Sequence, residues 1–370
     1  MRYILVENSN SPHEEGLIAI LNVLKSLGRD TTVFLGASHV DRARQLGIHE
    51  LAHRVITLKE RGAWLQLLRY RQHGDRTLYN TTSVRRTVFV FLTSFGRGKN
   101  IYYIRNANSW LRFSWHFTGW RDYLPRIAST AMKKFLFPRA HFVIAEFDSI
   151  RRYIEANADV RVDVIPFKNY HGTPPRRDSG RVHLVVPGVV DFRTKDIATM
   201  VNAIRRLPDA LRDQVKLTLL GRCASSAEEQ QCKAWKAELG EAFVYHSGFV
   251  PVSAFAEAFE TADAVICCFV LEHRCAHFSE TYGTSRGSGV VAHAFARALP
   301  LIVNEGFAVD AQYARATRTF RDETELASIL TPLTSDRSSL REWQRVAEAE
   351  AASYSLESVT KKLHYLTEEV

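Results

Sequence analysis

Short apolar runs alternate with amphipathic stretches along the first 167 residues. The apolar segment 2–7 is followed by a stripe of leucine and isoleucine at helical spacing in 16–27, and a second apolar segment, 31–35, comes next. A strand, a helix and a strand joined by short loops predict a βαβ unit with parallel strands. The same alternation predicts further strands near residues 54–58, 77–80, 101–104, 141–145 and 162–166.

A second alternation begins after a linker. Residues 168–181 are rich in proline, glycine and charge, which is typical of a connection between domains. The later apolar segments predict strands at 182–186, 216–220, 243–245, 264–269 and 301–303. The sequence therefore predicts two α/β domains, 1–167 and 182–345, followed by an amphipathic helical tail that includes 346–370. Two open α/β domains in tandem place a ligand cleft between the carboxyl ends of their sheets.

A glycine-rich loop precedes the apolar helix predicted over 290–298. Residues 283–289 combine three glycines, three hydroxyl side chains and Arg286. Such a loop at a helix start directs backbone N–H groups and the positive end of the helix dipole to one point, which suits a phosphate. Arg286 adds a guanidinium that binds two phosphate oxygens at once. The alternative is a tight turn in which the glycines serve only backbone geometry.

Five segments of the second domain form an ordered set: VPGVVDFRTK at 186–195, LTLLG at 217–221, VYHSGFV at 244–250, ADAVI at 262–266, and YGTSRGSG at 282–289 followed by ALPLI at 298–302. Together they resemble the nucleotide-sugar-binding half of GT-B type glycosyltransferases. The resemblance implies two Rossmann-like, doubly wound parallel-sheet domains facing a cleft, with a C-terminal helix that crosses back to the first domain. It also implies a metal-independent reaction, because fixed cations and a helix N-terminus neutralise the departing nucleoside diphosphate.

The same resemblance assigns a donor site. The implied donor-binding residues are Arg193, Lys195, Gly221, Phe249, Val250, Tyr282, Gly283, Arg286, Ser288 and Gly289. Of these, Arg193 and Lys195 are expected at the diphosphate, Ser288 with Gly289 at the phosphates, and the backbone near Phe249 at the nucleobase. The nucleotide sugar is a substrate, so no cofactor is expected.

One position departs from the large retaining families of this fold. Those families carry two glutamates around the glycine loop, where this chain has Arg286 and His293. The ribose-binding carboxylate is therefore missing unless Glu280 or Glu272 supplies it. The loop is more similar to a branch with a Tyr-Gly…Lys-x-Ser-Gly pattern, with Arg286 in place of lysine. Whether the reaction retains or inverts the anomeric configuration stays open.

Titratable and amide side chains follow strands of the first domain. His13, Glu14 and Glu15 come after the first strand, and one of them is expected to act as the base that takes the acceptor hydroxyl proton. Capping of the next helix is the competing interpretation for the two glutamates. The predicted acceptor-binding residues are Asn80, Arg105 and Asn106. The guanidinium of Arg105 suits an anionic sugar or a lipid phosphate.

The composition limits the class of protein. The hydrophobic fraction of 46% and charged fraction of 24% are those of a soluble globular protein. No apolar run reaches the ~18 residues that span a bilayer. The five cysteines have no metal-binding spacing, which favours free thiols in a reducing cytoplasm.

The net charge of +9 is unevenly distributed. Residues 61–140 hold 15 basic residues and two acidic ones, interleaved with tyrosine and tryptophan. This pattern predicts docking on an anionic membrane surface, which replacement of Arg85, Arg86, Lys133 and Lys134 should weaken. Nucleic acid is not expected as a partner because no binding motif accompanies the charge. A solvated basic face without a partner is the remaining alternative.

These observations favour a cytoplasmic glycosyltransferase on the inner face of the cytoplasmic membrane. It would move a sugar from a nucleoside-diphosphate donor to a lipid-linked or cell-envelope polysaccharide acceptor. The alternatives are a nucleotide-sugar epimerase of the same architecture and a non-catalytic nucleotide-sugar-binding partner. A Rossmann oxidoreductase is disfavoured because neither domain has G-x-G-x-x-G after its first strand.

Overall fold

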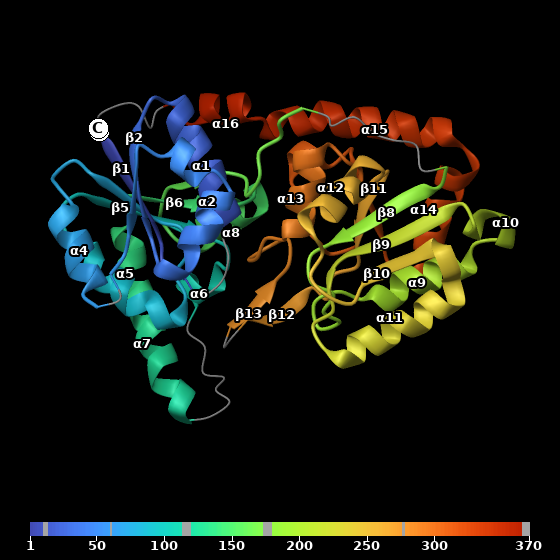
Figure 1. Ribbon diagram of the computed structural model, residues 1–370, viewed down its shortest axis with the longest axis horizontal. Helices are drawn as coiled ribbons and strands as arrows, with labels where there is room; N and C mark the ends of the chain where they lie inside the picture. Colours follow the sequence, from blue (N-terminus) through green and yellow to red (C-terminus); the bar gives the residue numbers. More distant parts are fainter. Residues whose placement is uncertain (10–13, 60, 113–119, 173–179, 276–277, 365–370) are drawn as a thin grey trace.

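The chain forms two α/β domains, each built on its own parallel sheet (Figure 1). A computed structural model describes residues 1–9, 14–59, 61–112, 120–172, 180–275 and 278–364. The first sheet has the order β3-β2-β1-β4-β5-β6-β7, and the second has the order β10-β9-β8-β11-β14-β15. In each sheet the order reverses beside the first strand of the domain, so both sheets are doubly wound, as predicted. A ligand crevice belongs at such a reversal, outside the carboxyl ends of the strands.

The first domain covers its sheet with helices on both faces. Its strands are β1 (Arg2–Glu7), β2 (Asp30–Leu35), β3 (Arg54–Thr57), β4 (Arg76–Tyr79), β5 (Lys99–Ile104), β6 (Phe142–Ala145) and β7 (Val162–Val164). Its helices are α1 (Glu14–Ser26), α2 (Val40–Gln45), α3 (Ile48–Leu51), α4 (Ala63–Tyr70), α5 (Thr87–Ser94), α6 (Asn108–Leu111), α7 (Trp120–Leu136) and α8 (Asp148–Asn157).

The second domain has the same layered arrangement. Its sheet strands are β8 (Val182–Pro187), β9 (Val215–Arg222), β10 (Phe243–His246), β11 (Ala264–Cys267), β14 (Leu301–Asn304) and β15 (Thr317–Phe320), and a separate hairpin is formed by β12 (Glu272–Cys275) and β13 (Phe278–Thr281). The helices are α9 (Ile197–Arg206), α10 (Asp209–Arg212), α11 (Ser226–Leu239), α12 (Val252–Glu260), α13 (Gly289–Arg297), α14 (Glu323–Ser335), α15 (Arg337–Ala351) and α16 (Leu356–Lys362).

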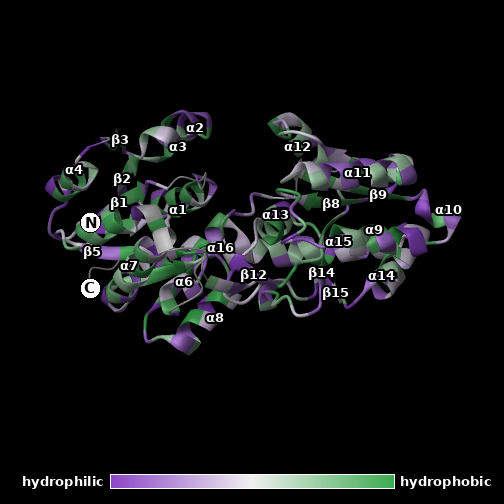
Figure 2. Cartoon of the chain, turned by 90° about the horizontal axis from the view of Figure 1, so that it is seen from below, coloured by the Kyte–Doolittle hydropathy of each residue, from purple (hydrophilic) through white to green (hydrophobic). Residues whose placement is uncertain are grey.

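Burial on both sheet faces explains the apolar runs in the sequence. Every residue of β8 is buried, and Figure 2 shows β8 and β9 as largely hydrophobic. One apolar cluster also crosses between the domains, where the rings of Phe147 and Phe295 meet edge to face with centroids 5.8 Å apart. The two domains therefore share part of their core.

Two features differ from the sequence expectation. The hairpin of β12 and β13 was not predicted, and it lies between the domains, next to α6 (Figure 1). The tail is two helices rather than one, because a 3₁₀ turn at Ala352–Tyr354 separates α15 from α16. Helix α15 passes through the predicted boundary at residue 345. Helix α16 packs on α1, with Val359 and Leu363 in the first domain's core, so the C-terminal helix crosses back as predicted.

Candidate active site

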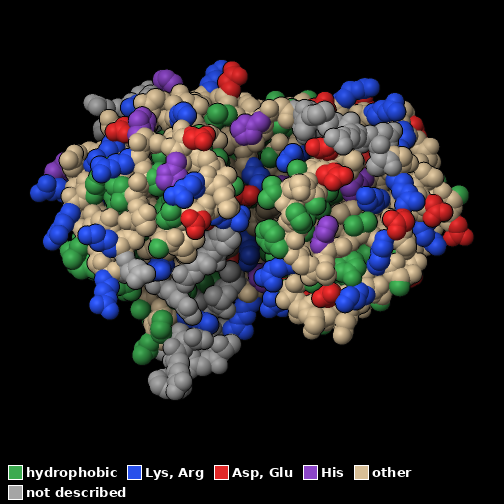
Figure 3. All heavy atoms as spheres, viewed as in Figure 1, with side chains coloured by type: hydrophobic (Ala, Val, Ile, Leu, Met, Phe, Trp, Pro, Cys, Tyr) green, Lys and Arg blue, Asp and Glu red, His purple; other side chains and the backbone are tan. Residues whose placement is uncertain are grey.

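Two cavities open in the furrow between the domains, where Figure 3 shows several lysine and arginine side chains. The first, the α13 cavity, has a volume of about 370 Å³ and lies at the start of α13, between the loop after β8 and Glu15 of α1. The second, the Arg105 cavity, has a volume of about 240 Å³ and lies at the carboxyl ends of β4, β5 and β6. Phe167, Arg286, Gly287 and Gly289 line both, so the cavities are neighbours.

Lys195 organises one wall of the α13 cavity. Its side chain is buried, and Nζ donates to the carbonyl oxygens of Pro187 at 3.0 Å and Val189 at 2.8 Å. Burial lowers the pKa of this ammonium group. Gly221 contributes indirectly, because a Cβ there would collide with the carbonyl of Gly188. The loop after β8 thus lies tight against β9, with the ammonium group at the cavity.

The glycine loop forms the opposite wall. Ser288 is the N-cap of α13, and its hydroxyl accepts from the N–H of Val290 at 3.2 Å. The N–H groups of Val290 and Val291 are bonded to Ser288 itself, so the attraction for an anion beside Ser288 and Gly289 comes from the positive end of the α13 dipole. The Arg286 guanidinium lies over the Tyr282 ring, 4.9 Å from its centre. The structure thus brings Lys195, Tyr282, Arg286, Ser288 and Gly289 together around one cavity, facing Glu15.

The other implied donor residues do not line this cavity. Arg193 is exposed and ion-paired with Asp191 at 2.8 Å, and it is Asp191 that faces the cavity. Gly283 has φ of +81°, and a Cβ there would lie 2.5 Å from the Ala308 nitrogen, so backbone packing explains this glycine. Phe249 is 76% exposed, whereas Val250 is buried. Contact of these two residues with a nucleobase stays a prediction.

His293, which the resemblance puts at the position of a family glutamate, lies at the α13 cavity. It stacks on Phe259 with ring centroids 5.2 Å apart. Burial lowers the pKa of His293 well below its usual value, and the nearby cations act in the same direction, so the imidazole is neutral. Glu280 does not reach this cavity, because it accepts from the N–H groups of Asn108 and Ser109 in α6. Glu272 is bonded across its own hairpin instead.

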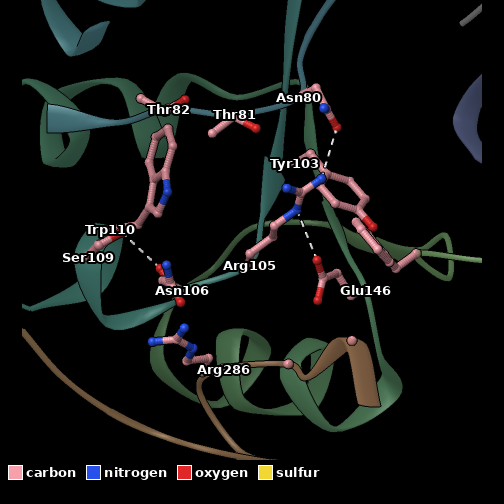
Figure 4. A pocket seen from close by; sticks show the side chains of 13 residues that line it. Asn80, Thr81, Thr82, Tyr103, Arg105, Asn106, Ser109, Trp110, Glu146 and Arg286 are labelled. Carbon is pink, nitrogen blue, oxygen red and sulfur yellow. Dashed lines mark hydrogen bonds and ion pairs between the residues drawn. The ribbon is translucent and has the colours of Figure 1, made fainter. Parts of the chain in front are cut away.

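The Arg105 cavity contains all three predicted acceptor residues (Figure 4). Asn80 donates to the buried carboxylate of Glu7 at the end of β1, and it also lies 3.4 Å from Nη2 of Arg105. Asn106 forms a β-bridge with Arg286 of the second domain. The ends of two strands and the glycine loop therefore meet here.

Glu146 is a cavity residue that the sequence prediction missed. It follows β6, is nearly buried, and its Oε1 lies 2.9 Å from Nε of Arg105. Burial raises the pKa of this carboxyl, and the positive charges of Arg105 and Arg286 partly oppose the rise. The available signal was a single carboxylate directly after the predicted strand at 141–145.

The structure describes two of the three predicted base residues, Glu14 and Glu15, and they lie in different surroundings. His13 lies outside the described residues. Glu14 is buried and turned toward α2, with Oε1 2.6 Å from His39 Nδ1. Burial raises its pKa, but the hydrogen bond and charge of His39 outweigh burial and the net pKa is lowered. This pairing leaves Glu14 unsuited to the role of base. Glu15 does line the α13 cavity, and it is ion-paired with Lys168 at 2.9 Å.

Within the residues that the structure describes, no group of three His, Cys, Asp or Glu side chains is arranged to hold a metal ion. In the same part of the chain, no helix has both the length and the apolar character required to span a membrane. Metal independence stays a prediction.

Comparison with known proteins was made at the levels of sequence and structure. No protein-family model and no curated protein matches this sequence. Among solved structures, HepE from Anabaena in complex with UDP has a TM-score of 0.67 at 16% identity, covering 98% of each chain. A glycosyltransferase from Rickettsia africae has a TM-score of 0.65 at 13% identity, covering 99% of this chain and 98% of that one. The chain has the GT-B fold.

A third structure with the GT-B fold is WaaG, a glycosyltransferase involved in lipopolysaccharide biosynthesis. It has a TM-score of 0.57 at 14% identity and covers 100% of both chains. In this fold the two cavities described above lie between the two Rossmann-like domains. At these identities the comparison establishes the architecture, and the chemistry has to be argued from the cavities.

Proposed function

We propose that this protein is a metal-independent glycosyltransferase that uses a nucleoside-diphosphate sugar. The observation that carries the proposal is the meeting of Lys195, Ser288 and the N-terminus of α13 in one cavity that adjoins a second cavity of the other domain. The neighbours of this fold include HepE crystallised with UDP and glucose. A donor in one cavity and an acceptor in the next would place the two reacting sugars at their shared wall.

The α13 cavity suits the leaving group. The bond between the sugar and the diphosphate breaks with negative charge accumulating on the phosphate oxygens. The Lys195 ammonium and the positive end of α13 are held in place before the reaction, so they stabilise that charge without reorganisation. We propose that the imidazole of His293, which lines this cavity, bonds a ribose hydroxyl in place of a carboxylate.

Three carboxylates line the two cavities. Asp191 is ion-paired with Arg193, whose hydrogen bond lowers the pKa of Asp191, so two carboxylates remain to receive the acceptor proton. Glu15 faces the α13 cavity, and Glu146 faces the Arg105 cavity beside Gly287, which belongs to the shared wall. We propose Glu146 as the better placed group, because it lies against Gly287 at the wall that both cavities share, and burial raises its pKa, which favours proton acceptance. The choice between a retaining and an inverting reaction does not enter this proposal.

Thermal unfolding with a panel of nucleoside diphosphates tests donor binding. The correct nucleotide at 100 times its Kd should add about 2.7 kcal/mol to the unfolding free energy. Product analysis with the matching nucleotide sugar, with and without added glycans, then separates the functions. A transferase needs the acceptor, an epimerase converts the donor without one, and a non-catalytic partner binds without turnover. Absence of a shift with all nucleotides would contradict the proposal.

A surface of the first domain supports a membrane-bound acceptor. Seven of the ten large apolar side chains that are exposed in the described chain lie on α4, α5 and α7 or directly after α5: Trp64, Leu65, Val88, Leu92, Phe95, Leu124 and Phe135. Arg86 and Arg139 are exposed beside them, and the Arg139 guanidinium lies 3.7 Å from the centre of the Phe135 ring. Apolar side chains flanked by cations suit the headgroup region of an anionic bilayer. We propose that this surface docks on the cytoplasmic membrane face, where lipid-linked acceptors reside.

The structure corrects one part of the predicted docking surface. Lys133 is buried, with Nζ 3.2 Å from Ser109 Oγ, so it faces α6 rather than lipid. Sedimentation with vesicles of phosphatidylglycerol and phosphatidylcholine should therefore be tested with Arg86, Lys134 and Arg139 changed to serine. Binding should fall and become insensitive to salt. A triple variant of the second domain, Lys233, Lys236 and Arg345 to serine, removes the same charge and should bind normally. Equal binding by both triple variants would contradict membrane docking.

A further inference from the structure

The Arg105 cavity contains buried donors that have no partner in the protein. Nη1 of Arg105, Nη1 of Arg286 and Oγ1 of Thr82 are each buried without a hydrogen bond, and all three residues line this cavity. A buried donor without an acceptor costs about 1–3 kcal/mol, so native proteins rarely leave several in one place. Three in one cavity indicate a ligand that supplies the acceptors.

The charge around the cavity indicates the kind of ligand. A guanidinium only donates hydrogen bonds, so its partner must be an acceptor. Glu146 pairs with the Nε side of Arg105, but its carboxylate is the one negative charge among the described residues that line the cavity, against two guanidinium groups. Behind this lining, Lys133 lies beside Ser109, and the carboxylates of Glu7 and Glu280 accept from the Thr81 hydroxyl and the Ser109 N–H. An anion would therefore supply acceptors for the unpaired donors and pair with the two guanidinium groups that line the cavity.

The position of the two arginines matters as much as their charge. Arg105 follows β5 of the first domain, and Arg286 belongs to the glycine loop of the second, so they enter the cavity from opposite domains (Figure 4). Arg105 is held between the rings of Tyr103 and Phe167, with its guanidinium 5.0 and 5.1 Å from their centres. An anionic group bound by both arginines would tie the domains together at the acceptor side.

We propose that the acceptor carries a phosphate or carboxylate group on the sugar that enters the Arg105 cavity, and that Arg105 and Arg286 bind this anion. The inference rests on the proposed glycosyl transfer, since it assigns the acceptor of that reaction. The anion belongs to the acceptor rather than to the donor diphosphate, because the unpaired Thr82 hydroxyl lies on the first-domain side.

Calorimetry on the full chain saturated with its nucleoside diphosphate tests the assignment. The probes are glucose 6-phosphate, glucuronate and glucose, which share a ring and differ in the anion. At least one anionic sugar should bind about 10- to 100-fold more tightly than glucose, the range expected for a charged hydrogen bond. The preferred anion then separates a phosphate from a carboxylate acceptor. Equal binding of all three sugars, or displacement of the anionic sugar by the nucleotide, would overturn the inference.

Variants test whether Arg105 and Arg286 cause the tighter binding of an anionic sugar. Arg105→Lys and Arg286→Met should remove most of the difference between anionic sugar and glucose. Arg112→Met is the control, because Arg112 is exposed at the end of α6 and does not line the cavity. The double variant Arg105→Met with Glu146→Gln removes the ion pair as a unit, in case loss of one partner unfolds the protein. Parallel loss for glucose and for the anion would overturn the assignment.

The same experiment keeps the two proposals apart. If the nucleotide raises the unfolding temperature but no anionic sugar is preferred, the acceptor inference fails and glycosyl transfer stands. If no nucleotide binds, the proposed function fails, and the anion preference of the Arg105 cavity is still measured directly with glucose 6-phosphate alone.

Discussion

Replacing Gly287 with alanine tests whether the glycine loop must touch the first domain. A methyl group at this position would collide with the Glu146 carboxylate and lie 2.6 and 2.8 Å from two carbons of the Phe147 ring. Carbon atoms pack comfortably at ~3.5–4.0 Å, so the loop and the first domain must move apart by about 1 Å. Overpacking of this kind costs about 1–3 kcal/mol. That cost corresponds to about a 5- to 150-fold shift away from the closed arrangement of the domains.

Gly289→Ala is the matched control for stability. It lies two residues away in the same loop, and a Cβ there would meet nothing within 4 Å. Urea unfolding should show Gly287→Ala to be less stable by about 1–3 kcal/mol, with Gly289→Ala unchanged or slightly more stable. Turnover of the nucleotide sugar should fall with Gly287→Ala because both cavities share this wall. Equal stability and full activity of Gly287→Ala would refute the idea that the loop and Glu146 must be in contact.

Three further predictions concern single groups. Burial raises the pKa of Glu280 from 4.5 to about 7, so the folded state favours the protonated carboxyl. The free energy of unfolding should therefore fall by up to about 3 kcal/mol as the pH rises from 5 to 8. Urea titrations of the Glu280→Gln variant should lack this fall. Lys195→Met should weaken nucleoside-diphosphate binding at least tenfold in calorimetry, whereas Lys216→Met, on the neighbouring strand β9, should not. Product formation should survive EDTA, and loss of turnover restored by Mg²⁺ would contradict the metal-independent mechanism.

The sheets were predictable because parallel strands are buried on both faces. Strands such as β8 and β11 are continuous apolar runs, and such runs stand out in any sequence. The hairpin of β12 and β13 was not predictable in this way. Its strands have four residues each and mix charged, polar and apolar side chains, so they carry no periodic signal.

In the candidate site, too, residues within a local motif could be predicted, whereas residues whose surroundings depend on distant parts of the chain could not. Lys195 and Ser288 were found because each belongs to a motif of neighbouring residues. Glu146 was missed because its role comes from Arg105, which is far away in the sequence and close only in the folded chain. Lys133 was placed on the surface for a similar reason, since only the packing of α7 on α6 shows that it is buried.

The contacts around the hairpin have a consequence for the timing of the reaction. The N–H of Ala107 donates to the Ser285 carbonyl at 2.8 Å, Asn108 donates to the Ser279 carbonyl at 2.8 Å, and Glu280 holds the start of α6. These bonds join the domains directly beside the cavities, while α16 joins them again on α1. In the proposed reaction, release of the nucleoside diphosphate would require some of these bonds to break. We expect release of the nucleoside diphosphate, rather than the glycosyl-transfer step, to limit the rate of turnover.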